Sequence, residues 1–196
     1  MCTSSLFHLE VQNVTCGPIH NLSFAWPVGV SWLCGDEGKG KTTLLRLLAK
    51  DMQPTSGKVV TPHGGVFWFD IQNSAHDATT MQSCWNDLRT LYPNWSEDVL
   101  NNLADALNMN AHREKQLHML STGSRRKVMV IAALASGAKV TLLDQPFAAL
   151  DFGSIRIIKD FLQEAAEHPT RAWIVADYTA PNDVPLACVL NLDDLQ

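Results

Sequence analysis

One short segment, residues 35–42, constrains the fold of this chain more than any other part of the sequence. It reads GDEGKGKT and satisfies the pattern GxxxxGKT in full. An apolar run at residues 30–34 precedes it, and leucines at helical spacing follow it at positions 44, 45, 47 and 48. A strand, a glycine-rich loop and a helix in that order aim backbone N–H groups and the positive end of the helix at one point, where a phosphate group can bind. The segment therefore predicts a phosphate-binding loop, and its setting favours that interpretation over a chance glycine-rich turn.

The residue types in this loop suit a bound nucleotide. Glycines permit unusual dihedral angles and close approach of the backbone to phosphate. The ammonium group of Lys41 is expected to pair with the terminal phosphates, and the hydroxyl of Thr42 to bind Mg²⁺. The residues expected to bind nucleotide here are Gly35, Asp36, Glu37, Gly38, Lys39, Gly40, Lys41, Thr42 and Thr43.

A second candidate ligand for Mg²⁺ lies further along the chain. Residues 140–144 read VTLLD, an apolar run that ends in a carboxylate. The carboxyl ends of parallel strands face the ligand crevice, so Asp144 is expected beside the phosphate loop, where it can hold Mg²⁺ through water. An acidic residue at a strand end is common, and it is the phosphate loop upstream that makes this one significant.

Composition and charge limit the class of protein. Hydrophobic residues make up 46% of the 196 residues and charged residues 18%, which suits a globular domain and excludes a disordered or collagen-like chain. The net charge of −5 lacks the basic footprint of a nucleic-acid-binding protein, so no nucleic-acid partner is expected. Residues 1–5 do not read as a secretory signal, and polar residues and prolines interrupt the uncharged stretch 11–35. These features predict a chain in the cytoplasm or on the cytoplasmic face of a membrane, with reduced cysteines.

The apolar pattern predicts alternating strands and helices around the phosphate loop. Period-two alternation at 7–11 and 22–26 indicates a small antiparallel layer, and residues 54–57 (PTSG) indicate a turn. The other expected elements are strands at 66–69, 140–143 and 172–176 and helices at 96–109, 122–135 and 154–166. Helices between apolar strands imply an α/β fold with a mainly parallel sheet covered on both faces. The expected domain organisation is a single domain, 1–196, with its core at 1–72 and 125–196 and a helical insert at 73–124.

A further motif precedes the aspartate strand. Residues 120–124 read LSTGS and stand just before an apolar helix. In that position the segment resembles LSGGQ, the signature of the ATP-binding subunits of ABC transporters. The other segments that carry the resemblance are PTSG at 54–57, Gln72 at the Q-loop position, LLDQP at 142–146, and Ala149, Leu150 and Asp151 as the D-loop. The resemblance covers nearly the whole chain and implies a P-loop NTPase fold of the ABC cassette type. In its small size the chain is similar to the cytochrome c maturation haem exporter cassettes.

The resemblance implies a ligand and two kinds of partner. ATP with Mg²⁺ would bind at the seam of a head-to-tail dimer, formed by two copies or by this chain and a second ABC cassette. An integral-membrane permease would be coupled through the helical insert. The nucleotide contacts implied on the signature side are Leu120, Ser121, Thr122, Gly123 and Asp151, and Gln72 is implied at both nucleotide and metal. A plain helix cap explains Ser121 equally well from the local pattern.

Three positions depart from the family pattern. Gln145 stands where a glutamate normally polarises the attacking water, and a neutral amide can orient water but cannot accept its proton. Tyr178 stands at the position of the switch histidine, with Asp177 as the alternative if the register differs by one residue. Cys16 stands where an aromatic residue would stack on adenine. Gln145 and Tyr178 are therefore the expected catalytic positions, and impaired hydrolysis is expected.

Gln145 leaves three explanations open. It is an engineered substitution that traps the ATP-bound dimer, or a native residue of a degenerate subunit with a competent partner, or part of a slow homodimeric ATPase. The alternative functions are a nonhydrolytic ATP-binding regulator of a membrane complex and a small P-loop kinase. A kinase has no reason to carry LSTGS before the aspartate strand.

Two groups of residues have open roles in the sequence. The aromatic residues Trp85, Tyr92 and Trp95 either line a cleft for a membrane subunit or form the core of a helical subdomain. The basic residues Arg125, Arg126 and Lys127 are expected to form a solvated helix face, with contact to nucleotide or a permease loop as the alternative.

Overall fold

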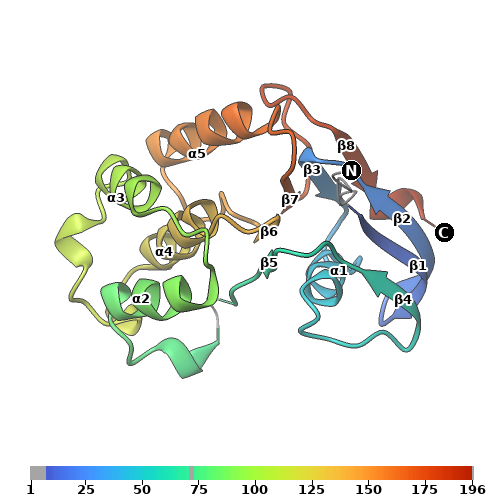
Figure 1. The fold of residues 1–196 in the computed structure, drawn as a ribbon, viewed down its shortest axis with the longest axis horizontal. Coiled ribbons are helices and arrows are strands. Elements are labelled where there is room, and N and C mark those ends of the chain that lie inside the picture. Colours follow the sequence, from blue (N-terminus) through green and yellow to red (C-terminus); the bar gives the residue numbers. More distant parts are fainter. Residues whose placement is uncertain (1–7, 71–72, 196) are drawn as a thin grey trace, which may run out of the picture.

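A central parallel sheet organises the chain (Figure 1). The computed structural model describes residues 8–70 and 73–195. Its larger sheet has the strand order β5-β6-β7-β3-β8, and every neighbouring pair is parallel. The strands are β3 (Gly29–Cys34), β5 (Val66–Phe67), β6 (Val140–Asp144), β7 (Ala172–Ala176) and β8 (Cys188–Asn191). The three central strands are almost wholly buried apolar runs, as expected where both faces of a parallel sheet are covered.

Successive residues of the central strands face two different cores. Trp32 and Trp173 lie in a core that four helices complete, whereas Leu33 and Ile174 lie in a core with the first helix and the smaller sheet. The helices are α1 (Lys41–Leu48), α2 (Met81–Leu91), α3 (Glu97–Ala106), α4 (Thr122–Ala135) and α5 (Phe152–Ala165). Figure 1 shows α2, α3 and α4 grouped on the side of the molecule away from α1 and the smaller sheet. The predicted α/β fold with a mainly parallel sheet is confirmed.

The smaller sheet is antiparallel and has the order β2-β1-β4. Its strands are β1 (Leu9–Cys16), β2 (Ile19–Trp26) and β4 (Ser56–Val60). Leu9 and Val11 of β1 are buried while Gln12 is exposed, so the alternation in the sequence corresponds to one face packed on the core. The predicted antiparallel layer is confirmed.

The turn predicted at 54–57 is wrong at its second half, because Ser56 and Gly57 begin β4. Gly57 has a φ of +89°, and a Cβ at this position would overlap the backbone of Gln12 and Asn13 in β1. The glycine is thus required where two strands approach closely, not where a turn reverses the chain.

The helix predicted at 96–109 begins as expected and ends early. The hydroxyl of Ser96 accepts a hydrogen bond from the Val99 N–H at 3.2 Å and caps α3. Asn108 then adopts a φ of +58°, and the Met109 N–H donates to the Ala104 carbonyl at 2.7 Å. A left-handed residue followed by such a bond closes a helix C-terminus, so α3 stops at Ala106.

The described residues also form four short 3₁₀ turns. They are η1 (Ser74–His76), η2 (Asn110–His112), η3 (Leu117–Met119) and η4 (Leu192–Asp194). Within residues 8–70 and 73–195, no helix has the length and apolar character needed to cross a bilayer.

Trp85 belongs to the core. Its side chain is 1% exposed, and its indole N–H donates to the Val128 carbonyl in α4 at 3.0 Å. Tyr92 and Trp95 are partly buried against the same core, and the Tyr92 hydroxyl donates to the Val66 carbonyl at 3.3 Å. These contacts favour the core interpretation of the three aromatic residues over a cleft.

Replacing Trp85 by phenylalanine removes the hydrogen bond to Val128 and leaves a cavity between α2 and α4. We expect Trp85→Phe to lower the free energy of unfolding by about 1–3 kcal/mol. The matched control is Leu91→Ala in the same helix, where the side chain is 69% exposed and the expected change is within about 0.5 kcal/mol. Urea denaturation followed by circular dichroism measures both. Equal stability of Trp85→Phe and the unsubstituted chain would contradict the core assignment.

Candidate functional site

The phosphate loop connects β3 to α1 and has the geometry of an anion site. Gly38 and Gly40 have φ values of +79° and +100°, a region that other residues enter only with strain. Gly40 caps α1 without a side-chain hydrogen bond. The first N–H groups of α1 therefore have no intrahelical acceptor and face the loop, which suits a negatively charged ligand.

Lys41 is folded back onto this loop. The residue is 6% exposed. Its ammonium group donates to the carbonyl of Gly35 and, at 2.9 Å, to that of Asp36. The same nitrogen lies 4.7 Å from the centre of the Tyr178 ring. Lys41 and Tyr178, which are far apart in the sequence, therefore meet at the site.

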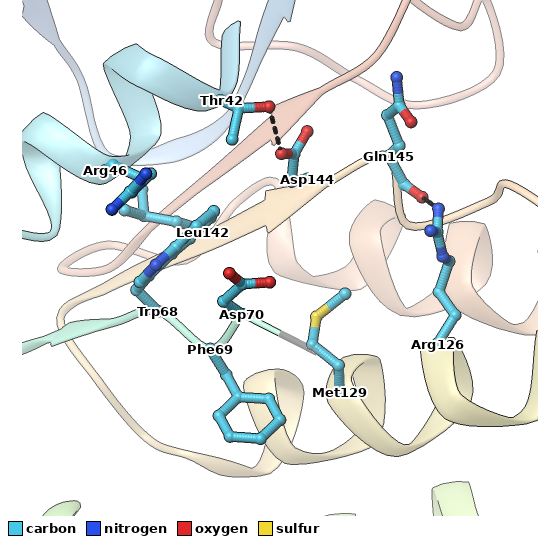
Figure 2. Close-up of a pocket in the computed structure, with 10 residues that line it drawn as sticks. All are labelled: Thr42, Arg46, Trp68, Phe69, Asp70, Arg126, Met129, Leu142, Asp144 and Gln145. Atoms are coloured by element: carbon cyan, nitrogen blue, oxygen red, sulfur yellow. Dashed lines mark hydrogen bonds between the residues drawn. The ribbon is translucent and has the colours of Figure 1, made fainter. Parts of the chain in front are cut away.

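Thr42 and Asp144 meet at the opposite end of the loop. The Thr42 hydroxyl donates to a carboxylate oxygen of Asp144 at 2.6 Å (Figure 2). Burial raises the pKa of Asp144 above its ordinary value, against the opposing effect of this hydrogen bond. A hydroxyl and a carboxylate this close are the oxygen ligands that a hard cation such as Mg²⁺ prefers. The donors around the loop and this oxygen pair together fit a magnesium–polyphosphate ligand.

Gln145 and Tyr178 both line the cleft above the phosphate loop. The cleft has a volume of about 430 Å³, and its walls include Pro18, Glu37, Lys41 and Thr43. Gln145 has a φ of +45°, and its N–H donates to the Ala176 carbonyl at 2.8 Å. The two expected catalytic positions thus lie on the phosphate side of the sheet edge, as the sequence predicts.

A smaller pocket of about 210 Å³ adjoins the first (Figure 2). It shares Thr42 and Gln145 with the cleft, and Asp144 forms part of its wall. Arg126 of α4 also lines it, so a basic side chain shares the pocket with Thr42 and Asp144.

Comparison with known proteins is consistent with this site. A sequence profile of the family described as "ABC transporter" matches residues 19–148. The chain belongs to the ABC transporter family. The "Cytochrome c biogenesis ATP-binding export protein CcmA" of Pseudomonas savastanoi pv. phaseolicola is 31% identical over 139 residues, 65% of either chain. The "ABC transporter I family member 10" of Arabidopsis thaliana is 29% identical over 185 residues, 88% of this chain and 68% of its own. This chain thus spans about two thirds of the length of these relatives.

Solved structures of ABC proteins share the fold. The "Putative ABC transporter (ATP-binding protein) from Pyrococcus furiosus" superposes with a TM-score of 0.73 at 20% identity, over 95% of this chain and 98% of the other. A "putative metal-chelate type ABC transporter" gives the same TM-score at 24% identity, over 95% of this chain and 80% of its own. The cassette fold predicted from the sequence is therefore confirmed.

The ABC signature lies apart from the phosphate loop of its own chain. None of the residues Leu120, Ser121, Thr122 and Gly123 lines the cleft or the smaller pocket. Ser121 caps α4, because its hydroxyl accepts a hydrogen bond from the Ser124 N–H at 3.1 Å, and both Ser121 and Thr122 are exposed. The structure thus shows the helix-cap role of Ser121, and the nucleotide contact expected of it is not made to the cleft of its own chain.

Gly123 has a packing role that the sequence does not reveal. A Cβ at this position would overlap the carbonyl oxygen of Ala149 in the D-loop. The signature and the D-loop of one chain therefore touch through backbone.

Asp151 of the D-loop caps α5. Its carboxylate accepts hydrogen bonds from the hydroxyl of Ser154 at 2.6 Å and its N–H at 2.8 Å, and it pairs with Lys127 at 3.2 Å. The bonds from Ser154, followed by that from Lys127, hold the pKa of Asp151 well below its usual range. Within the chain, Asp151 therefore caps α5, pairs with a side chain of α4 and does not line the cleft.

The basic cluster is not the solvated face that the sequence suggests. Arg125 pairs with Asp77 at 2.8 Å, and Arg126 donates to the carbonyl of Gln145. Lys127 contacts the carbonyl of Leu107 as well as Asp151. That prediction is wrong because each side chain finds an acceptor on a different neighbouring segment, which the local sequence cannot show.

Two expected positions do not reach the cleft or cannot be placed. Gln72 lies outside the described residues. Cys16 does not line the cleft, and its sulfur lies 3.5 Å from that of Met52. Pro18, two residues further along the chain, lies in the cleft wall instead.

One contact of the phosphate loop is absent from the sequence prediction. Asp193 in η4 accepts a hydrogen bond from the Asp36 N–H at 3.0 Å and pairs with Lys39 at 3.4 Å. The partners are separated by most of the chain, so only the tertiary fold brings them together.

The contact between Gly123 and Ala149 predicts the cost of a single methyl group. We expect Gly123→Ala to lower the free energy of unfolding by about 1 kcal/mol or more, since overlap with the D-loop carbonyl outweighs the better helix propensity of alanine. Thr122→Ala, in the same exposed turn, adds no overlap and is the control. Thermal unfolding monitored by circular dichroism compares the two. A Gly123→Ala chain more stable than the control would contradict the predicted packing.

Proposed function

We propose that this chain is the ATP-binding subunit of an ABC transporter and that it binds Mg·ATP at the seam of a cassette dimer. The observation that carries the proposal is the contact between Thr42 and Asp144 at the head of the phosphate loop. It joins the two elements from which a triphosphate and its metal ion would be held. The family membership of the chain supports the same ligand.

Each residue of the cleft has a distinct role in this proposal. Lys41 exchanges its carbonyl partners for the β- and γ-phosphates, and the N–H groups at the start of α1 bind the remaining phosphate oxygens. Thr42 and Asp144 hold Mg²⁺, with Gln72 as a further candidate ligand. When bound, the metal ion neutralises charge on the phosphates. Gln145 orients water toward the γ-phosphate, and Tyr178 donates a hydrogen bond from its hydroxyl.

The exposed signature supports a partner chain at the nucleotide. Ser121 and Thr122 stand at the N-terminus of α4, a helix of 14 residues, and neither side chain faces its own phosphate loop. The positive end of α4 therefore has no nucleotide to meet within the chain. In a head-to-tail pair it meets the γ-phosphate bound to the partner, together with Leu120 and Gly123, while Asp151 lies at the seam.

Transport requires a membrane partner. The proposal places this chain on the cytoplasmic face of a membrane, where an integral permease contacts the segment 73–124. The 196 residues act as one cassette, with 1–72 and 125–196 as its nucleotide-binding core. The export function in the name of the Pseudomonas relative is consistent with such a partner.

Hydrolysis is the step that Gln145 limits. An amide holds water through hydrogen bonds but has no basic site for its proton, so the chain binds ATP well and cleaves it slowly. Tyr178 is also expected to slow hydrolysis. It stands at the position of the switch histidine, is 51% exposed, and its ring covers Lys41. These two residues favour, as the second candidate function, a nonhydrolytic subunit that regulates a membrane complex by binding ATP.

Restoring the carboxylate distinguishes these two functions. We expect Gln145→Glu to raise steady-state phosphate release by about 10² or more, the usual contribution of a general base. The double variant Gln145→Glu with Lys41→Ala serves as the control and is expected to lose this gain. Release is measured with and without the permease. No gain while ATP still binds would contradict the ATPase function and support the nonhydrolytic subunit.

The dimer is tested at Thr122. We expect Mg·ATP to convert the chain from monomer to dimer, and Thr122→Glu to prevent this, because a carboxylate at the seam repels the partner's triphosphate. An acidic residue in the first turn favours the α4 dipole, so the monomer keeps its stability. Thr122→Gln is the neutral control. Size-exclusion chromatography with light scattering reads the mass, and a Thr122→Glu dimer would contradict the proposed position of the signature.

A further inference from the structure

Arg126 is a buried cation in the pocket that contains Thr42 and Asp144. Among the residues that the structure describes, Lys41 and Arg126 are the only charged side chains that are buried, and Arg126 is 8% exposed. Lys41 is the first residue of α1, directly after the phosphate loop, whereas Arg126 reaches the site from the second turn of α4 (Figure 2). Such a charge is costly to bury unless it is paired and hydrogen-bonded, so its contacts indicate what it does.

The guanidinium group holds the backbone of Gln145. One of its Nη atoms donates to the Gln145 carbonyl, which also accepts a hydrogen bond from the Ala148 N–H at 3.3 Å. The Gln145 N–H is held in turn by the Ala176 carbonyl. These bonds hold Gln145 at a φ of +45°, a left-handed conformation that is uncommon for a residue with a Cβ. In Figure 2 the Gln145 side chain points away from Arg126, and it is among the residues that line the cleft of Lys41 and Tyr178.

The charge on Arg126 has no bonded counter-ion within the described chain. None of its atoms forms an ion pair there, and its Nε is buried without an acceptor. Asp144 and Asp70 line the same pocket as Arg126, and Arg46 adds a second positive charge to its wall. The Arg126 charge also opposes the rise in the pKa of Asp144 that burial causes. A metal ion at Thr42 and Asp144 would therefore share this pocket with the carboxylate of Asp70 and the positive charges of Arg46 and Arg126, and only Arg126 is buried.

We propose that Arg126 is a positioning residue that fixes residue 145 toward the nucleotide cleft and that its charge weakens divalent metal binding at Thr42 and Asp144. The inference rests on the proposed function. It assigns Arg126 two effects of opposite sign: it supports hydrolysis through the backbone of residue 145 and opposes metal binding through its charge. A role in packing α4 alone produces neither effect.

Metal affinity is the first test. Mn²⁺ is titrated into the full chain with a nonhydrolysable ATP analogue, and free Mn²⁺ is read by electron paramagnetic resonance. We expect Arg126→Gln to bind Mn²⁺ about threefold more tightly or better, since a nearby positive charge is removed. Arg126→Lys keeps the charge and is expected to bind like the unsubstituted chain. Arg125→Gln removes the same charge one residue away, where it pairs with Asp77, and is the matched control.

Positioning is tested in the Gln145→Glu background, in which we expect measurable hydrolysis. We expect adding Arg126→Gln to lower kcat about tenfold or more with little change in KM for ATP, because residue 145 loses its fixed geometry while the phosphate loop is untouched. Arg125→Gln is expected to leave kcat unchanged. Thermal unfolding of each variant verifies that it is folded, and Arg126→Lys provides a folded comparison if Arg126→Gln is not.

The outcomes separate this inference from the function on which it rests. Equal Mn²⁺ affinities for Arg126→Gln and Arg125→Gln, or a loss of affinity that Arg126→Lys shares, would overturn the inference alone. Failure of the unsubstituted chain to bind Mn²⁺ with the nucleotide analogue would overturn the proposed function and the inference with it.

Discussion

The site depends on a register that runs across the parallel sheet. Leu33 of β3 and Asp144 of β6 both lie opposite Ala176 of the intervening strand β7, so the three residues stand at one level. The chain turns into the phosphate loop directly after that level in β3, reaches Gln145 directly after it in β6, and reaches Tyr178 two residues after it in β7. Parallel strands end on the same edge, and this shared level brings groups from distant parts of the sequence within hydrogen-bond distance. The contact of Thr42 with Asp144 is its clearest product.

Those parts of the fold that carry a local signal could be predicted from the sequence. The phosphate loop depends on glycine spacing, and α4 and β7 depend on apolar runs. The helix α4 and the strand β7 have the predicted bounds. β4 and β8 could not be predicted in the same way. β4 begins where a proline–threonine–serine–glycine segment indicates a turn, and β8 is four residues long, too short to show a period. Both strands exist because neighbouring strands supply their hydrogen bonds, which is a property of the tertiary structure.

The same distinction applies to the site. Asp144, Gln145 and Tyr178 follow apolar strands, so their place at the sheet edge could be inferred from sequence order. Asp193, which binds the phosphate loop, has no sequence signal because its partners lie at the other end of the chain. The burial of Arg126 and its bond to Gln145 also have no local signal, because three adjacent basic residues normally indicate a solvated surface. The fold instead places Gly123, Arg126 and Lys127 of α4 against the segment that follows β6.

Three contacts join that segment to the first half of α4. Gly123 lies against the Ala149 carbonyl, Arg126 holds the Gln145 carbonyl, and Lys127 pairs with Asp151. The rest of α4, from Val128 to Ala135, is buried, so the helix cannot shift relative to these contacts without disturbing a close-packed core. A displacement of α4 must therefore move residues 145–151 with it or break bonds to buried groups. The signature opens α4 and Gln145 lines the chain's own cleft, so these contacts connect the two positions within one chain. A neutral amide at 145 leaves these contacts in place, since Arg126 holds the backbone of that residue and not its side chain. A carboxylate at 145 would add a proton acceptor at the cleft without removing that backbone contact.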